Sequence, residues 1–200
     1  MKPKRLILFF LLLFLNAVNA EALILAGKII PDTIVYDGQQ LVLNGTMLRR
    51  LYGVKVYIAC LYLEEKSSDP AEITMANRKM AIRLYWLRVI GKKKIKIGYY
   101  KSFGESMNIP QKGVYNKQTD FGTIDAEIDE FITIVSAKKI PKDTIWDYIY
   151  IPEKGSEIYF GDTLQGTVKT LEFKQRLFGQ WLGDFAVISK RNKKKLFGLK

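Results

Sequence analysis

The stretch of residues 43–63, LNGTMLRRLYGVKVYIACLYL, constrains the fold more than any other part of the chain. It opens with Asn44-Gly45, a dipeptide typical of tight β-hairpin turns. From Tyr52 onward, β-branched, aromatic and aliphatic residues follow one another, and alternate side chains of a strand point to opposite faces. Both faces of this strand are largely apolar, so we predict a central strand that is covered on both sides.

Two arginines, Arg49 and Arg50, precede this strand. A planar guanidinium group matches two oxygens of a carboxylate or an enolate at once, which makes it a natural anchor for an acidic ligand. Strand alternation lets only one of the two side chains point inward. The plainer interpretation is that both arginines are solvated residues of a hairpin.

Residues 1–20, MKPKRLILFFLLLFLNAVNA, have the composition of a secretory signal peptide. A basic start is followed by an unbroken apolar run over residues 6–15 and then by small residues up to Ala20. The apolar run is short for a membrane span, so we predict cleavage after Ala20 rather than an uncleaved anchor. No cysteine follows that site to carry a lipid anchor.

The remaining chain, residues 21–200, has the length of a single domain and is long enough to bury a core. Its only cysteine, Cys60, lies within the central strand and has no partner for an internal disulfide. An exported protein without disulfides fits a bacterial periplasm, which is the location that we predict.

The formal net charge of the chain is +12. Much of the excess lies in residues 92–96 and in the segment from residue 190 onward, which we expect to form a loose basic tail. Leu196, Phe197 and Leu199 leave open the alternative that this tail docks on the fold. No nucleic-acid-binding motif accompanies these charges, so no nucleic-acid partner is expected. Weak contact of the basic tail with an anionic membrane surface is physically reasonable. The sequence leaves the oligomeric state open.

The chain contains no histidine, which removes Ser-His-Asp and Cys-His catalysis and the usual proton shuttle near neutral pH. It also lacks a cysteine pair and a glycine-rich phosphate loop. We therefore expect neither a metal nor a cofactor, and any chemistry falls to Arg, Lys, Tyr, Asp or Glu.

Hydrophobic periodicity predicts further elements around the central stretch. Strands are expected over residues 21–28, 33–36, 39–44, 79–90, 146–151, 157–160 and 164–169. Helices are expected over residues 70–77, 92–108, 123–137 and 171–182. Pro70 suits the start of the first helix, and Thr170 and Gly183 suit the start and end of the last.

Two groups of residues resemble the bacterial chalcone isomerase-like family. The first group lies in the central stretch and just after it: Leu43-Asn44-Gly45, Arg49, Lys55-Val56-Tyr57-Ile58-Ala59, Leu61-Tyr62-Leu63 and Ser68-Asp69-Pro70. The second group lies near the C-terminus: Gly166, Phe173, Leu177-Phe178, Trp181-Leu182-Gly183 and Leu196-Phe197-Gly198. The resemblance implies an α+β fold, in which a large antiparallel sheet has helices packed on one face and a ligand cleft between the layers.

The family includes plant enzymes that close a chalcone to a flavanone, and non-catalytic relatives that bind fatty acids in the same cleft. Arg49 matches the family's arginine, but Tyr57 stands in the place of a catalytic threonine. Of a Tyr-x-x-Lys-x-x-x-Asn pattern only Lys94 is matched, and residues 171–188 contain no Ser or Thr. Each lost donor typically removes about 3–4 kcal/mol of transition-state stabilisation. Chalcone isomerase activity is therefore not expected, and the sequence assigns no catalytic residue.

These residues predict a non-catalytic binder of a fatty acid or a similar amphiphilic carboxylate. Arg49 would pair with the carboxylate, Tyr57 and Lys94 would lie beside it, and the apolar layer would hold the tail. Two alternatives stay open. One is an isomerase or lyase with different chemistry, which uses Arg49 with Tyr57 or Lys94 as acid and base. The other is a structural or interaction protein of the cell envelope, with Arg49 tied to an acidic neighbour such as Glu64 or Asp69.

Overall fold

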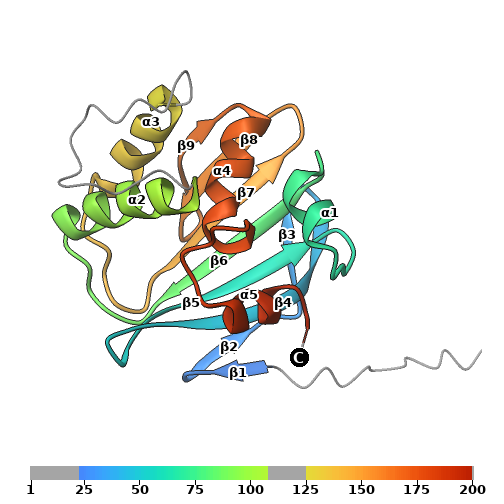
Figure 1. Ribbon diagram of the computed structural model, residues 1–200, viewed down its shortest axis with the longest axis horizontal. Coiled ribbons are helices and arrows are strands. Elements are labelled where there is room, and N and C mark those ends of the chain that lie inside the picture. Colours follow the sequence, from blue (N-terminus) through green and yellow to red (C-terminus); the bar gives the residue numbers. More distant parts are fainter. Residues whose placement is uncertain (1–22, 108–124, 200) are drawn as a thin grey trace, which may run out of the picture.

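A computed structural model describes residues 23–107 and 125–199 (Figure 1). Its centre is a seven-stranded antiparallel sheet in which every strand pairs with its neighbours in chain order, from β3 to β9. The strands of this sheet are β3 (Thr33–Tyr36), β4 (Gln39–Leu51), β5 (Val54–Leu63), β6 (Met80–Trp86), β7 (Ile145–Ile151), β8 (Gly155–Phe160) and β9 (Thr163–Val168). A separate two-stranded sheet pairs β1 (Leu23–Leu25) with β2 (Lys28–Ile30).

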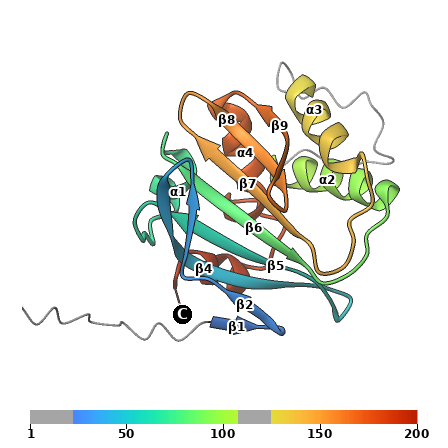
Figure 2. The same ribbon diagram turned by 180° about the vertical axis from the view of Figure 1, so that it is seen from behind.

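The helices lie on one face of the large sheet, as Figure 1 and the reverse view in Figure 2 show. They are α1 (Pro70–Met75), α2 (Lys92–Ser106), α3 (Asp125–Ser136), α4 (Leu171–Leu182) and α5 (Lys190–Leu196). The predicted α+β architecture with helices on one face is therefore confirmed. Within the described residues, no helix is long and apolar enough to span a membrane.

The sheet is buried on both faces near β5, as predicted for a central strand. Ala59 and Leu61 pack in the main core beneath the helices. Ile58 and Cys60 point the other way, into a second core that also contains Ile34 from β3. Figure 2 shows that the sheet curls, which brings β3 across this second face.

The expected hairpin turn at Asn44-Gly45 is wrong, because β4 runs straight through these two residues. Asn44 is the extra residue of a β-bulge, and its buried side chain donates to the Leu196 carbonyl at 2.8 Å. The chain instead turns at Tyr52 and Gly53, whose φ angles are 50° and 78°. A two-residue turn with both φ angles positive matches the twist of the strands that it joins.

The expected loose basic tail is also wrong, because residues 190–196 form α5. Ser189 caps this helix by accepting from the amide of Asn192, and Leu196 and Phe197 are buried against the fold. The apolar residues that follow the lysines thus anchor a helix that charge alone would leave in solvent.

The other predicted helices and strands agree with the structure except at their ends. The expected first strand is a hairpin of β1 and β2, because the chain turns at Ala26 and Gly27, both with positive φ. Asp69 caps α1 and Thr170 caps α4 through backbone amides. The predicted signal peptide and the residues numbered 108 and 123–124 at predicted helix ends lie outside the described residues.

Candidate functional site

A cavity of about 350 Å³ lies between the large sheet and the helix layer. Strands β4, β5 and β6 form its floor, and α2 and α4 cover it. Its walls are mainly apolar and aromatic: Val56, Leu84, Trp86, Ile95, Tyr99 and Trp181. A concave, mainly apolar site with a few polar groups is the usual form of a small-molecule pocket.

All three residues that the sequence singled out, Arg49, Tyr57 and Lys94, line this cavity. Arg49 and Tyr57 are direct partners across the β4–β5 ladder, so their side chains share one face of the sheet. Lys94 comes from the opposite layer, on the exposed side of α2. The structure therefore brings together residues from two strands and one helix.

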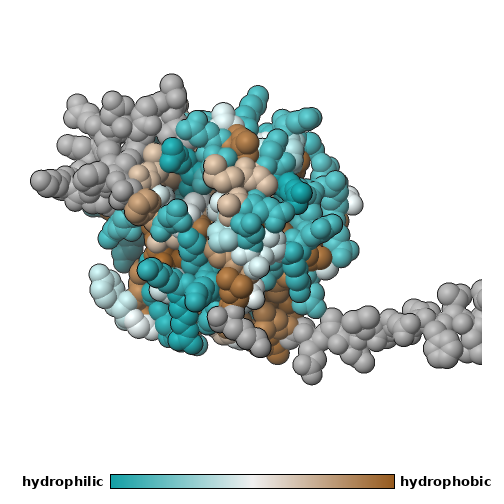
Figure 3. Space-filling view, turned by 45° about the vertical axis from the view of Figure 1, so that its right-hand side comes forward, coloured by the Kyte–Doolittle hydropathy of each residue, from teal (hydrophilic) through white to brown (hydrophobic). Residues whose placement is uncertain are grey.

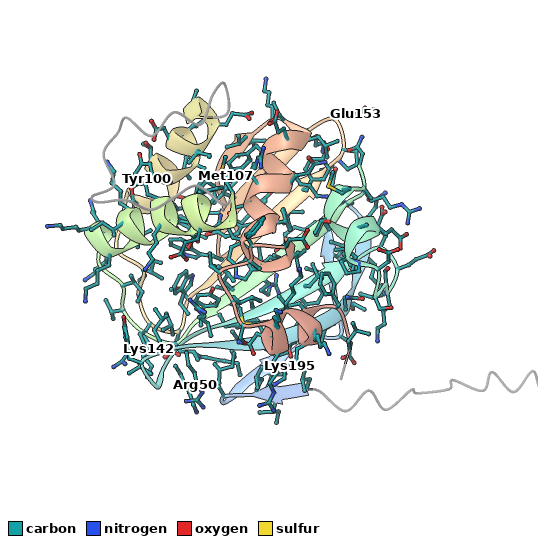
Figure 4. The ribbon with its side chains drawn as sticks, viewed as in Figure 1. Arg50, Tyr100, Met107, Lys142, Glu153 and Lys195 are labelled. Carbon is teal, nitrogen blue, oxygen red and sulfur yellow. The ribbon has the colours of Figure 1, made fainter. Side chains whose placement is uncertain are left out.

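Arg50 is the arginine that faces away from the cavity. Its side chain is exposed, and its Nη1 donates to the Gly53 carbonyl at 3.1 Å, across the turn that follows β4. Figure 4 shows Arg50 at the outer edge of the molecule. Strand alternation thus gives Arg49 the inward position and leaves Arg50 as a natural control.

A second β-bulge shapes the cavity at the start of β5. The register shifts between Arg49 and Arg50, so that Val56 is an extra residue with no direct partner on β4. A bulge breaks the alternation of faces, and Val56 and Tyr57 both line the cavity although they are consecutive. The alternation that we expected along this strand would place Val56 and Tyr57 on opposite faces, and at these two residues that expectation is wrong.

Tyr57 is positioned by two indole rings. Its hydroxyl oxygen accepts from Trp181 Nε1 at 3.1 Å, and its ring lies edge-on to Trp86 with 5.2 Å between centroids. Burial raises the pKa of Tyr57, while the Trp181 hydrogen bond and the Arg49 charge oppose that change. The phenol is therefore protonated near neutral pH and can donate its proton in a hydrogen bond.

The cavity also contains buried donors that sequence reasoning missed. Trp86 Nε1 and Gln180 Nε2 are buried and have no hydrogen-bond partner among the described residues, and both residues line the cavity. A buried donor without a partner typically costs about 1–3 kcal/mol, so both groups are a local energetic cost of packing the cavity wall. For Gln180 the sequence held a signal, since an amide stands beside the apolar stripe of Leu177 and Trp181 on α4.

The positive charge of Arg49 has no acidic partner in the described part of the chain. Among residues 23–107 and 125–199, no carboxylate forms an ion pair with Arg49. Of the two acids considered from the sequence, Glu64 is exposed, and Asp69 accepts from the amides of α1. The site thus offers a guanidinium and a neutral phenol beside an apolar space.

Comparisons with known proteins agree with this architecture. No curated protein sequence matches the chain. A solved structure, the crystal structure of a fatty-acid binding protein from Arabidopsis thaliana, is similar with a TM-score of 0.68 and 16% sequence identity. The similarity covers 88% of this chain and 96% of that protein. The sequence model of the family described as chalcone isomerase-like matches residues 22–198. The chain therefore belongs to the chalcone isomerase-like family.

Proposed function

We propose that this protein binds a fatty acid or a similar amphiphilic carboxylate in the cavity between sheet and helices. The observation that carries this proposal is the pairing of an apolar cavity with Arg49, a cation that has no acidic partner among the described residues. A carboxylate is the group that a guanidinium binds best, through two parallel hydrogen bonds. Tyr57, as a neutral phenol, is able to donate a further bond to the same group.

The size and character of the cavity support an aliphatic tail. Its volume of about 350 Å³ lies within the range of roughly 300–1,000 Å³ that is common for ligand pockets. Each methylene transferred from water contributes about 0.8 kcal/mol, so a chain of moderate length binds well without any chemistry. The solved Arabidopsis structure is that of a fatty-acid binding protein, which gives further support at the level of the shared fold.

The raised pKa of Tyr57 speaks against the isomerase or lyase alternative. A phenol that serves as a general base needs a pKa near the working pH, and burial moves the pKa of Tyr57 in the opposite direction. The lack of an acidic partner for Arg49 among the described residues likewise speaks against a purely structural role, because a filled cleft would pair that charge with an acid.

We also propose that the protein acts in a bacterial periplasm. The support is the sequence of residues 1–20, whose basic start, apolar run and small residues before the cleavage position are typical of an exported protein. Mass measurement of the protein recovered from the periplasm of an expressing bacterium tests this. We expect the mass of a chain that begins at Glu21, and a mass that includes residues 1–20 would contradict cleavage.

Native mass spectrometry of the purified protein, followed by extraction of any bound molecule, tests the binding proposal. We expect one bound fatty acid per chain, which is lost in Arg49→Ala and kept in Arg50→Ala. Arg50 is the matched control because it is adjacent in sequence but donates to the Gly53 carbonyl outside the cavity. A protein that is empty and takes up no added fatty acid would overturn the proposal.

A further inference from the structure

One end of the molecule gathers cations around an open groove that is separate from the cavity. Lys28, Lys55, Arg88 and Lys142 line this groove, and Arg50 is the strand partner of Lys55. We call these five residues the basic end; Figure 4 shows Arg50 and Lys142 on it. Among the described residues, the one carboxylate lining the groove is Asp143, which lies 2.7 Å from Lys28 Nζ and 3.9 Å from Lys142 Nζ. The basic end therefore has a strong excess of positive charge.

Tyr52, at the tip of the β4–β5 turn beside the basic end, is fully exposed at 104% of its reference area. Its φ of 50° is in the left-handed region, which costs an L-residue other than glycine or asparagine roughly 1–2 kcal/mol. Asparagine, aspartate and glycine are preferred at this position of the turn. Neither packing nor turn geometry accounts for a tyrosine there, and backbone strain of this kind is concentrated at functional positions.

Further apolar side chains are exposed around the same end. Leu51 and Val54 flank the turn, Val89 follows β6, and Ile24 and Ile29 are exposed on the β1–β2 hairpin. Figure 3 shows hydrophobic residues at the lower edge of the molecule among hydrophilic ones. Aliphatic and aromatic side chains rimmed by cations suit the interface of a lipid bilayer, where tyrosine is enriched at the level of the headgroups.

The basic end also borders the cavity. Val54 and Lys55 line the groove, whereas Val56 next to them lines the cavity. Val89 lines the groove and Ile90 lines the cavity in the same way. Residues 54–56 and 89–90 thus run between the groove and the cavity. A partner that covers the groove therefore lies next to the cavity.

We infer that the basic end is a docking surface for an anionic lipid bilayer, with the cations against lipid phosphates and Tyr52 among the headgroups. Docking depends only on this surface. The purpose of docking, which is exchange of an amphiphile between the bilayer and the cavity, rests on the proposed function. Nucleic acid would also attract the cations, but it offers no apolar environment for the exposed aliphatic residues.

Co-sedimentation of the purified protein with vesicles tests the inference. We expect binding to vesicles made of equal parts phosphatidylglycerol and phosphatidylcholine, and little binding to phosphatidylcholine alone. Tyr52→Asn creates an Asn-Gly turn, which favours the hairpin and so keeps the fold. We expect it to weaken vesicle binding about tenfold through the loss of an apolar ring. Met75→Asn, on α1 at the opposite end of the molecule (Figures 1 and 2), is the matched control and should bind unchanged.

A charge series locates the docking surface. Lys55→Gln combined with Lys142→Gln should weaken binding more than tenfold, since each cation near an anionic surface contributes about a fivefold factor. Lys194→Gln combined with Lys195→Gln removes the same charge from exposed positions of α5 and should have little effect. The opposite ranking would assign binding to α5 and overturn the inference. Binding to phosphatidylcholine vesicles as tight as that to anionic vesicles would also overturn the inference. So would binding of a DNA duplex that is as tight as binding of anionic vesicles and that Tyr52→Asn leaves unchanged.

Uptake of a fatty acid without vesicles separates this inference from the proposed function. Tyr52→Asn should keep uptake and lose vesicle binding, whereas Arg49→Ala should lose uptake and keep vesicle binding. Failure of vesicle binding with normal uptake refutes docking alone. Normal vesicle binding without uptake refutes the proposed function alone.

Discussion

Gly45 in β4 lies directly beneath the main chain of Lys195 in α5. A Cβ built on Gly45 would be 2.0 Å from the Lys195 carbonyl oxygen and 2.6 Å from that of Leu196. Backbone atoms cannot move aside as a flexible side chain does, so any residue larger than glycine forces α5 away from the sheet.

Gly45→Ala should therefore lower the free energy of unfolding by about 2 kcal/mol or more, through the loss of close packing around Leu196 and Phe197. Urea denaturation followed by circular dichroism measures this change. Gly179→Ala in α4 is the control, because nothing lies within 4 Å of its added Cβ. It should stabilise the protein by up to about 1 kcal/mol. A neutral Gly45→Ala would show that α5 does not pack on β4 as described.

Trp181→Phe should weaken fatty-acid binding while leaving the fold intact. The substitution keeps an aromatic ring in the core but removes the Nε1 donor that positions the Tyr57 hydroxyl at 3.1 Å. One neutral hydrogen bond contributes about 1 kcal/mol, so we expect about a fivefold weaker affinity by isothermal titration calorimetry. Trp146→Phe is the comparison, since Trp146 stacks on Phe160 and contacts Trp86 but does not itself line the cavity or bond to Tyr57. An equal effect of both substitutions would point to general loosening of the core.

Asp147→Asn should be strongly destabilising. Arg83 donates to both oxygens of Asp147, at 2.8 Å and 3.0 Å, and the hydroxyl of Tyr36 donates to the same carboxylate. Removing the negative charge leaves a largely buried guanidinium unpaired, at a cost of about 3–5 kcal/mol in the free energy of unfolding. Arg83→Met combined with Asp147→Leu removes both charges and should cost less than Asp147→Asn alone. Chemical denaturation of the unmodified protein, Asp147→Asn and the double variant measures the three stabilities. A double variant that is less stable than Asp147→Asn would contradict the prediction.

Lys174 should make stability depend on pH in the alkaline range. Its buried Nζ donates to the Thr74 and Ala76 carbonyls at the end of α1, and burial lowers the pKa of Lys174 to about 8. An unfolded lysine has a pKa of about 10.4, so between these values the unfolded chain binds more protons than the folded one. The free energy of unfolding therefore rises with pH above about 8, whereas below that value both states are charged and this dependence ends.

The expected rise between pH 8 and about 9.5 is up to about 2 kcal/mol, measured by urea denaturation at several pH values. Lys174→Met should remove the rise, because the variant has no group that titrates at this position. Persistence of the same slope in Lys174→Met would assign the dependence to other groups.

Local patterns were sufficient for much of the fold. The apolar run of β5, the helix start at Pro70 and the cap at Thr170 depend on residues close together in the chain, and each agrees with the structure. For the same reason the sequence pointed to Arg49 and Tyr57, because the resemblance that marks them lies in a single continuous stretch.

Other features were decided by contacts between distant segments. Asn44-Gly45 has the composition of a turn, yet it lies inside β4, because α5 packs on Gly45 from about 150 residues further along the chain. The lysines from residue 190 onward are helical only because Leu196 and Phe197 reach the core. Local propensity contributes less free energy than burial, so the tertiary contact prevails.

The cavity also combines features that the sequence determined with features that only the tertiary structure decided. The sequence determined which polar groups stand near the central strand, but strand register decided that Arg49 rather than Arg50 points inward. The shared face of Val56 and Tyr57 follows from a bulge in strand pairing. Register and layer packing are set by the whole sheet at once, because shifting one strand by a residue exchanges its two faces, and for that reason only the tertiary structure placed these groups around one cavity.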